Sequence, residues 1–379
     1  MTAQDVKPQR VVIKIGSSSL TSRHGEISQK KLEKLADEIV QLKDAGHEVV
    51  LVSSGAVAAG YRKLGCLDRP STLPEKQAAA SIGQGLLIET YSKLFLSHGY
   101  VASQILITRN DFSDEIRYNN VRNTINVLLE RGIIPIVNEN DTVTTERLKF
   151  GDNDTLSAKV AGLVDANQLV ILSDIEGLYD SDPRKNENAK LLEEVYEITP
   201  EIEAAAGGSG SSVGTGGMKS KIDAVKIATA LGISTFLGKS NIPNIIVDAV
   251  NQEAKGTYFK VDKDASNLNQ KEQWIAFNSG PKGKMVINDV AKSTLIAKTR
   301  GIAVSDIISI EGRFDKGSVI RIMSKSGEEI GLGIVNYPSY KLSKLLESNI
   351  DVKSQKYQKY VIDTNDFVCQ LEITIPVGL

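Results

Sequence analysis

The 379-residue chain is long enough for two or three domains, and its composition excludes several classes of protein. Hydrophobic residues make up 41% of the chain, which is enough for a packed core and excludes global disorder. The net charge of −2 gives no overall field that would attract nucleic acid or a membrane surface. Cys66 and Cys369 lie far apart in the sequence, so neither a disulfide framework nor a thiolate metal site is expected.

The sequence also predicts a cytoplasmic protein without a membrane segment. The first ten residues, MTAQDVKPQR, lack the apolar core of a signal peptide. No apolar run approaches the ~20 residues that a membrane-spanning helix needs. The low cysteine content fits a reducing compartment.

From Val11 onward, short apolar segments alternate with segments of helical periodicity. Apolar segments rich in β-branched residues predict buried parallel strands at 11–16, 47–56, 101–108, 133–141 and 167–179. Apolar stripes at helical spacing predict helices at 28–46, 76–99, 118–132, 154–166 and 219–232. Two more apolar runs follow, at 233–237 and 244–250. Strands separated by helices predict an α/β fold in which a mostly parallel central sheet is sandwiched by helices.

The pattern changes after about residue 260. The segment KVDKDASNLNQKEQ (260–273) is polar and without periodicity, as linkers are. Short apolar segments with turn signals at Gly312, Gly317 and Gly327 then predict a small β-rich domain. We therefore expect a first domain over residues 1–262, a linker over 263–274 and a second domain over 275–379.

The expected strands of the first domain end in small, polar or charged residues. Ligands of open parallel sheets bind beyond the carboxyl ends of the strands. One polar strand end would mean little, but four together predict a site for a polar ligand. The residues at these ends are Lys14, Gly16 and Ser17; Ser53, Ser54 and Gly55; Asn138, Glu139, Asn140 and Asp141; and Ser173 and Asp174.

Lys14 lies within the apolar segment VVIKIG and shares strand parity with Val12 and Gly16. A lysine there is costly unless a negative partner neutralises it. One interpretation is a side chain that reaches solvent from the strand end. The other is a fixed positive charge for a phosphate, which Gly16 and the serines after it favour.

The segment GDNDTLSAK places Asp152, Asn153 and Asp154 directly before an expected helix. Aspartate and asparagine are favoured helix N-caps, and we expect Asp154 to cap this helix. Two carboxylates and an amide in three residues exceed what a cap requires. They are suited to an ammonium group, a metal ion or a lysine.

Residues 207–221, GGSGSSVGTGGMKSK, are rich in glycine and end in two lysines. They match neither the P-loop pattern nor G-x-G-x-x-G. They do precede an expected helix, whose N-terminus attracts anions, and Lys219 and Lys221 add positive charge. The segment therefore favours a backbone that approaches phosphates. A surface linker is the alternative, above all for its first half.

The chain has only three histidines, His24, His47 and His98, and none lies at a strand end named above. Hydrolases and alcohol kinases usually need a general base. A carboxylate acceptor does not, because a pKa near ~4.3 leaves it ionised at pH 7. Phosphoryl transfer to a carboxylate needs mainly positioning and charge neutralisation, which fits this set of residues.

These motifs resemble those of the amino acid kinase family, in particular of members that phosphorylate glutamate. The tail resembles the PUA domain that many such enzymes possess, so the resemblance covers nearly the whole chain. The motifs GTGGMKSK and GDNDTLSA together are specific to this family, whereas SSG alone would be weak support for it. Ser53 and Ser173 stand where threonine is common in the family. The blocks that match, in order and spacing, are VVIKIGSSSL, VSSGAVAAG, IPIVNENDTV, FGDNDTLSA, LSDIEGLYDSDPR and GTGGMKSKIDAV.

The resemblance implies an amino acid kinase domain over 1–262 and a PUA-like domain over 275–379. It implies transfer of the γ-phosphoryl group of ATP to the side-chain carboxylate of L-glutamate, which gives L-glutamyl 5-phosphate, the first step of proline biosynthesis. Mg²⁺ would arrive mostly with ATP, without a metal site fixed by the protein. A homo-oligomer, either dimer or tetramer, and feedback inhibition by proline are also expected.

The resemblance further implies a role for each matched residue. Lys14 and Lys221 would flank the transferred phosphoryl group, and Asp154 would hold both lysines in place. The glutamate-binding positions would be Ser54, Asp141 and Asn153, with Asp152 nearby. The nucleotide-binding positions would be Lys14, Gly16, Gly55, Ser173, Asp174, Thr215, Gly216, Gly217, Met218, Lys219, Ser220 and Lys221.

Two alternatives stay open. A sister kinase would act on another acid, such as acetylglutamate, aspartate or carbamate. An RNA-binding protein with an inert kinase-like domain is the second alternative, because PUA-like tails bind RNA in other proteins. The tail is only weakly basic, whereas salt-dependent RNA binding needs several phosphate contacts.

Overall fold

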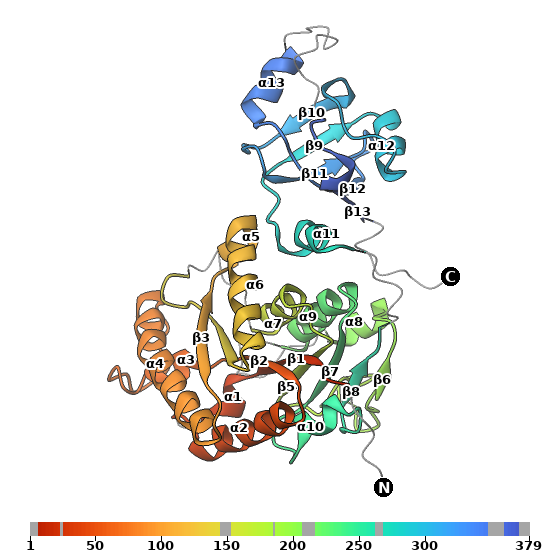
Figure 1. The fold of residues 1–379 in the computed structure, drawn as a ribbon. Coiled ribbons are helices and arrows are strands. Elements are labelled where there is room, and N and C mark those ends of the chain that lie inside the picture. Colours follow the sequence, from red (N-terminus) through yellow and green to blue (C-terminus); the bar gives the residue numbers. More distant parts are fainter. Residues whose placement is uncertain are drawn as a thin grey trace. The chain divides into compact units, whose positions relative to one another are not determined.

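The chain forms two compact units in the computed structural model (Figure 1). The first unit comprises Met1–Asp111 and Glu115–Ser266, and the second comprises Phe112–Asp114 and Asn267–Leu379. The division falls inside the segment 263–274, and the domain boundaries expected from the sequence stay a prediction. The structure describes residues 7–22, 26–144, 153–184, 186–206, 217–261, 268–347 and 360–370.

The first unit is built on an eight-stranded sheet with helices on both faces (Figure 1). Its strands are β1 (Arg10–Ile15), β2 (Glu48–Val52), β3 (Ala102–Ile107), β4 (Ile134–Glu139), β5 (Gln168–Ser173), β6 (Glu194–Val195), β7 (Ser234–Lys239) and β8 (Thr257–Phe259). The helices up to residue 250 are α1 (Ser17–Leu20), α2 (Gln29–Asp44), α3 (Ala56–Gly60), α4 (Leu73–Ser97), α5 (Arg109–Ser113), α6 (Glu115–Glu130), α7 (Asn153–Leu163), α8 (Pro200–Ala206), α9 (Met218–Ala230) and α10 (Ile245–Val250).

The strand order is β3-β4-β2-β1-β5-β7-β8-β6, and all neighbouring strands are parallel except β7 and β8. This confirms the mostly parallel sheet that the sequence predicted. β1 lies between β2 and β5, so the chain leaves β1 toward one side of the sheet and later returns to the other. Such a reversal opens a crevice at the carboxyl ends of the strands, which is where ligands of open α/β sheets bind.

The central strands are buried on both faces, as their continuous apolar segments predicted. Alternate residues of β1, such as Val11 and Ile13, pack with α2, α4 and α10 in one core cluster. The side chains between them point to the opposite face, which α7 and α9 cover (Figure 1). Lys14 belongs to that opposite face, so β1 delivers its side chain toward α7 and α9.

Periodicity predicted the long elements but not the short ones. β6 and β8 have two and three residues, too few to show an alternating pattern, and they were missed. Of the two apolar runs after α9, the first lies largely in β7 and the second forms α10. Among the described residues, no helix combines the length and the hydropathy that crossing a bilayer requires.

The second unit contains a five-stranded sheet in the order β10-β9-β11-β12-β13, which confirms a β-rich tail. One apolar cluster, including Ile320, Ile322 and Phe367, packs against this sheet. Its strands are β9 (Lys284–Ile287), β10 (Ile307–Glu311), β11 (Val319–Met323), β12 (Glu329–Ile334) and β13 (Phe367–Cys369). Its helical segments are α11 (Gln270–Gln273), η1 (Trp274–Asn278), α12 (Asp289–Ile296), η2 (Val304–Asp306), α13 (Ser339–Glu347) and η3 (Thr364–Asp366).

The polar segment that predicted a linker contains a helical turn. The Asn269 side chain accepts hydrogen bonds from the backbone N–H groups of Lys271 and Glu272, and Glu272 bonds back to the Asn269 N–H. This capping box starts α11, and η1 continues it with the buried Trp274. Local capping, rather than periodicity, therefore orders these residues.

Candidate active site

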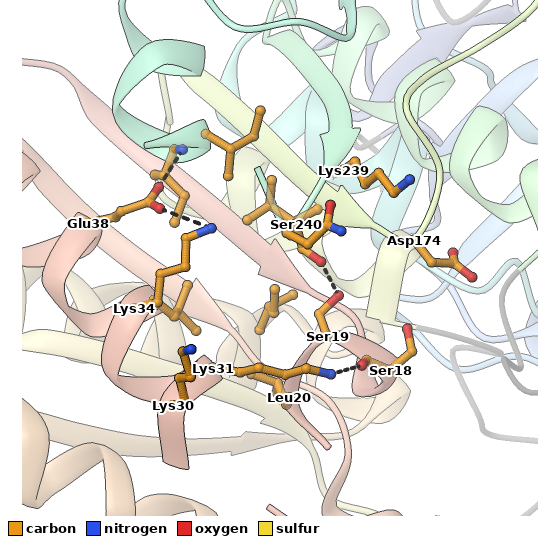
Figure 2. A pocket seen from close by; sticks show the side chains of 16 residues that line it. Ser18, Ser19, Leu20, Lys30, Lys31, Lys34, Glu38, Asp174, Lys239 and Ser240 are labelled. Atoms are coloured by element: carbon orange, nitrogen blue, oxygen red, sulfur yellow. Dashed lines mark hydrogen bonds and ion pairs between the residues drawn. The ribbon is translucent and has the colours of Figure 1, made fainter. Parts of the chain in front are cut away.

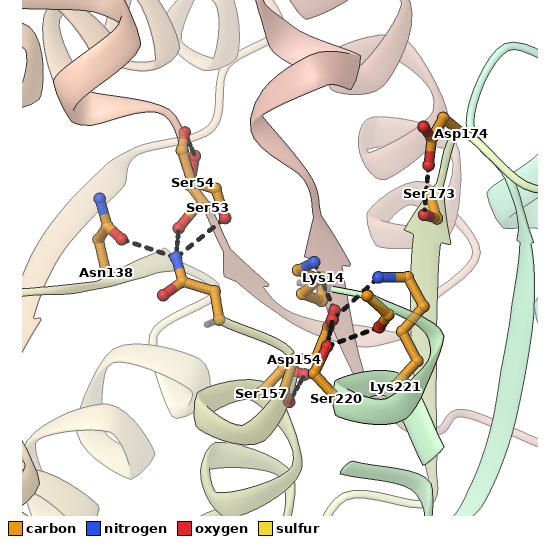
Figure 3. A network of polar contacts seen from close by, with 12 residues as sticks. Lys14, Ser53, Ser54, Asn138, Asp154, Ser157, Ser173, Asp174, Ser220 and Lys221 are labelled. Carbon is orange, nitrogen blue, oxygen red and sulfur yellow. Dashed lines mark hydrogen bonds and ion pairs between the residues drawn. The ribbon is translucent and has the colours of Figure 1, made fainter. Parts of the chain in front are cut away.

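Lys14 and Lys221 contact the same carboxylate, that of Asp154 (Figure 3). Lys14 extends from β1 to Oδ1 of Asp154, and the Nζ atom of Lys221 in α9 lies 3.0 Å from Oδ2. The side-chain exposures are 7% for Lys14, 6% for Lys221 and 0% for Asp154. Three elements far apart in the sequence thus bring one carboxylate and two lysine side chains together beneath the carboxyl edge of the sheet.

Burial raises the pKa of Asp154, but the charges of Lys14 and Lys221 lower it more, so this pKa lies below its ordinary value. Asp154 is therefore ionised at neutral pH. The two ammonium groups and one carboxylate together bear one net positive charge in a buried position. Such a site attracts an anion, because a buried charge gains most from a partner of opposite sign.

Asp154 does not act as an N-cap, and that expectation was wrong. The helix α7 begins at Asn153, so Asp154 lies within its first turn. The Asp154 carboxylate faces the two lysines, and the Ser220 hydroxyl donates to its Oδ2 over 3.1 Å. Two buried ammonium groups attract a carboxylate more strongly than the backbone N–H groups of a helix start do.

Three of the predicted glycines precede helices whose first turns face the strand ends. Gly16 is the N-cap of α1, Gly55 of α3 and Gly217 of α9. Gly55 has a left-handed conformation with φ of 95°, which disfavours any side chain. A Cβ atom at Gly16 would lie 3.9 Å from the Nζ atom of Lys14, so a side chain there would begin beside the ammonium group. The backbone near Lys14 is thus kept open to a ligand.

Two of the predicted acceptor-binding residues, Ser54 and Asn153, form a second polar group with Asn138 at the ends of β2 and β4 (Figure 3). The Nδ2 atom of Asn153 donates to Ser54 Oγ over 3.0 Å and to Asn138 Oδ1 over 2.9 Å. Asp141 is half-buried in the turn after β4. Asp152 lies outside the described residues. Because Asn153 and Asp154 are consecutive in α7, this group adjoins the lysine cluster.

Ser173 and Asp174 end β5, where the Ser173 hydroxyl donates to Asp174 Oδ1 over 3.0 Å. In the described part of the chain, no hydrogen bond or ion pair joins these two residues to the lysine cluster. Of the predicted nucleotide segment, Met218 and Ser220 are half-buried at the start of α9 and Lys219 is exposed. Thr215 and Gly216 lie outside the described residues.

A cavity of about 540 Å³ lies on the other face of the sheet, between α1, α2 and α10 (Figure 2). Among the described residues that line it, Asp174 is the one that the sequence predicted as a site residue. Two of the lysines that line it bond to backbone carbonyls: Lys31 donates to those of Ser18 and Thr21, and Lys34 donates to that of Ile242. Because Ile15 lines the cavity and Lys14, Asp154 and Lys221 do not, this cavity is distinct from the lysine cluster.

Two contacts from α4 to the site were not predicted from the sequence. Gln84 accepts a hydrogen bond from Asn138, and Tyr91 shares one with Ser53. Both lie in a segment whose apolar character predicted only a helix. Their spacing of seven residues, which places them on one helix face, is the signal that could have found them.

The fold and this site define a phosphotransferase of the amino acid kinase class. The model of the "Amino acid kinase family" matches residues 9–239, and that of the "PUA domain" matches residues 283–354. A carbamate kinase from Giardia lamblia bound to AMP-PNP has the same fold, with a TM-score of 0.50 and 17% identity over 67% of this chain and 99% of that one.

Relatives of known name are more similar and match along nearly the full length. "Glutamate 5-kinase 2" of Bacillus licheniformis is 64% identical over 97% of this chain and 99% of its own length. "Glutamate 5-kinase 2" and "Glutamate 5-kinase 1" of Bacillus subtilis are 61% and 44% identical, over 99% and 96% of this chain and 99% of each relative. The chain therefore belongs to the glutamate 5-kinases of the amino acid kinase family.

Proposed function

We propose that this chain transfers the γ-phosphoryl group of ATP to the side-chain carboxylate of L-glutamate, which gives L-glutamyl 5-phosphate and ADP. This product is the first intermediate of proline biosynthesis. The observation that supports the proposal best is the Asp154 carboxylate between Lys14 and Lys221. The names of the two Bacillus relatives that are 61% and 64% identical favour glutamate over acetylglutamate, aspartate or carbamate as the acceptor.

The reaction needs no general base. An oxygen of the glutamate side-chain carboxylate attacks the γ-phosphorus, the bond from that phosphorus to the bridging oxygen breaks, and ADP leaves with the electron pair. The acceptor is already ionised at pH 7, since its pKa is near ~4.3. Of the histidines in the described part of the chain, His47 directly precedes β2 and His98 follows α4. Neither stands at the carboxyl edge where the acceptor would bind.

Lys14 and Lys221 would stabilise the negative charge that spreads over the transferred group. Preorganised positive charges in a site that excludes water stabilise such a transition state more than water does. Asp154 would hold the two ammonium groups at a fixed separation before substrate arrives. The N–H groups at Gly16 and Gly55 would add hydrogen bonds to phosphate oxygens, as helix N-termini do.

The acceptor would bind at the ends of β2 and β4, through Ser54, Asp141 and Asn153, with Asp152 contributing. Carboxylate and amide oxygens accept hydrogen bonds from the α-ammonium group of an amino acid. The adjacency of Asn153 and Asp154 in α7 supports this assignment, because it sets the acceptor beside the lysine cluster.

The nucleotide would lie against Ser173, Asp174 and the residues from Thr215 to Lys221. Its phosphates would point to Gly16, Gly55 and Lys14. The N-terminus of α9 at Gly217 supports this placement, since the helix dipole favours a negative group there.

Mg²⁺ would enter bound to ATP, as part of that substrate. Both oxygens of Asp154 face lysines, which does not suit a cation at that position. Within the described residues, no group of three or more histidine, cysteine, aspartate or glutamate side chains is arranged for a metal ion. Mg²⁺ would therefore be held mainly by the phosphates of ATP and by waters, as it commonly is.

An acceptor survey tests the proposal. The protein, with MgATP and hydroxylamine, is offered L-glutamate, N-acetylglutamate, L-aspartate or carbamate in turn. Hydroxylamine converts an acyl phosphate into a stable hydroxamate, so a coloured iron complex reports the product. We expect hydroxamate with L-glutamate and none above background with N-acetylglutamate or L-aspartate, and no ADP release with carbamate. Turnover with another acid but not with L-glutamate would reassign the substrate.

A further inference from the structure

Helix α4 presents three polar side chains at intervals of seven residues: Gln77, Gln84 and Tyr91. Seven residues make two turns, so these side chains share one helix face. Each makes a hydrogen bond to a segment at the carboxyl edge of the sheet. The pairs are Gln77 with the Thr144 carbonyl at 3.2 Å, Gln84 with the Asn138 side chain at 2.8 Å, and Tyr91 with the Ser53 hydroxyl at 3.1 Å.

The middle contact is one of three that orient the buried amide of Asn138. Its Nδ2 donates to Gln84 Oε1, and its Oδ1 accepts from the Glu139 backbone N–H and from Asn153 Nδ2, each over 2.9 Å. If the amide were turned over, its NH₂ group would meet two other donors, and its oxygen would face Gln84. The acceptor on Gln84 therefore favours the orientation that leaves Oδ1 toward Asn153.

The oxygen of Asn138 is in turn one of three acceptors that orient the amide of Asn153. With Nδ2 of Asn153 directed to the Asn138 side chain, the Ser54 hydroxyl and the Ser53 carbonyl, Oδ1 is the atom that remains to accept a hydrogen bond. No contact to that oxygen occurs within the described segments of the chain. The α-ammonium group of an amino acid is a donor only, so it requires this oxygen rather than the NH₂ group.

We propose that Gln84 is a positioning residue for the amino acid acceptor, which acts through Asn138 on Asn153 without touching the substrate. The inference rests on the proposed function, because it assumes that Asn153 contacts the acceptor. The hydrogen bonds that link Gln84 to Asn138 and Asn138 to Asn153 do not involve the residues proposed to bind the nucleotide and its phosphates. A change at Gln84 therefore affects acceptor binding and leaves the affinity for ATP unaltered.

Gln84→Met tests the proposal, since methionine keeps the length and the helix propensity but removes the acceptor oxygen. We expect KM for L-glutamate to rise about tenfold, while kcat and KM for ATP stay within about twofold. Gln84→Glu retains an acceptor for Asn138 and should restore KM for L-glutamate to within about threefold of wild type. Thr90→Val is the matched control, because that hydroxyl bonds only within α4, to the Leu86 carbonyl.

A double-mutant cycle shows whether the effect passes through Asn138. In an Asn138→Ala background, Gln84→Met should add less than a twofold change in KM for L-glutamate. The proposal fails if Gln84→Met leaves this KM unchanged, raises KM for ATP as much, or has its full effect in that background. Gln84→Ala is measured in the same way if the methionine variant does not fold, as judged by circular dichroism. If wild type itself turns over no L-glutamate, the proposed function fails instead.

Discussion

Lys14 and Lys221 contact opposite oxygens of one buried carboxylate, although the first lies in β1 and the second in α9. The two elements are not neighbours in the chain, and α7 supplies the residue that joins them. The arrangement fixes two positive charges before any anion binds. A site built in this way does not need to reorganise when charge develops on a transferred group.

Removing one of these charges tests their part in the reaction. Lys221→Met should lower kcat by about 10²–10³-fold, because preorganised charge supplies that share of rate in comparable sites. KM for L-glutamate should change little, since Lys221 lies with the lysine cluster rather than with Asn153. Steady-state kinetics with MgATP provides the measurement.

Lys226→Met is the control for that variant. Lys226 lies in the same helix, but its Nζ atom pairs with Glu203 at 2.6 Å, away from Asp154. Its kcat should stay within about twofold of wild type. A folded Lys221→Met protein with a kcat within tenfold of wild type would contradict the role given to Lys221.

Asp154 also links stability to pH. The pKa of Asp154 is depressed in the folded protein, against an ordinary value near ~3.9. Its contribution to stability is therefore complete above about pH 5 and is lost as the pH falls through the depressed folded value. Asp154→Asn leaves two buried ammonium groups without their carboxylate, and we expect a loss of about 3–5 kcal/mol at pH 7.

Urea unfolding from pH 7 to pH 3 measures this effect. The gap in stability between wild type and Asp154→Asn should be constant above pH 5 and narrow below pH 4. Asp68→Asn, at an exposed position in the loop before α4, should track wild type throughout. A gap that stays constant down to pH 3 would show that the Asp154 carboxylate is not the titrating group.

Much of this site follows from the sequence because residues at strand ends share one edge of a parallel sheet. Lys14, Ser54 and Ser173 each end an apolar strand segment, so their places were predicted before any contact was known. The pairing of Lys14 with Asp154 was expected from the family resemblance, whereas the residues alone left a solvent-reaching lysine or a phosphate partner open.

The contacts made by α4 could not be predicted in this way. Gln84 lies in a helix whose apolar residues face several directions, so no apolar stripe shows which helix face points at the sheet, and only the seven-residue spacing of Gln84 and Tyr91 indicates it. The interpretation of Asp154 as a helix cap failed for a related reason. Cap preference is a local property, whereas the attraction of Lys14 and Lys221 depends on elements far away in the sequence.

Proline inhibition is a prediction from the family resemblance. Proline has the same α-carboxylate as glutamate and an α-ammonium group, so we expect it to compete for the site at the ends of β2 and β4. Adding L-proline at low L-glutamate should raise the apparent KM for L-glutamate without changing kcat. D-proline at the same concentrations is the control. A rate that L-proline leaves unchanged at low L-glutamate would contradict this prediction.

The contact between α3 and α4 allows a sharp test of how the site is positioned. A Cβ atom added at Gly83 would lie 1.8 Å from the Ala56 carbonyl oxygen, so the two helices would have to separate. We expect Gly83→Ala to cost about 2 kcal/mol or more of stability. It should also lower kcat/KM, because Gly55, the N-cap of α3, lies in the proposed phosphate site. Gly85→Ala, two residues on and exposed, has nothing within 4 Å and should gain about 0.5–1 kcal/mol without loss of activity. Equal thermal shifts of the two variants in a melting experiment would show that the close approach of α3 and α4 does not constrain the fold.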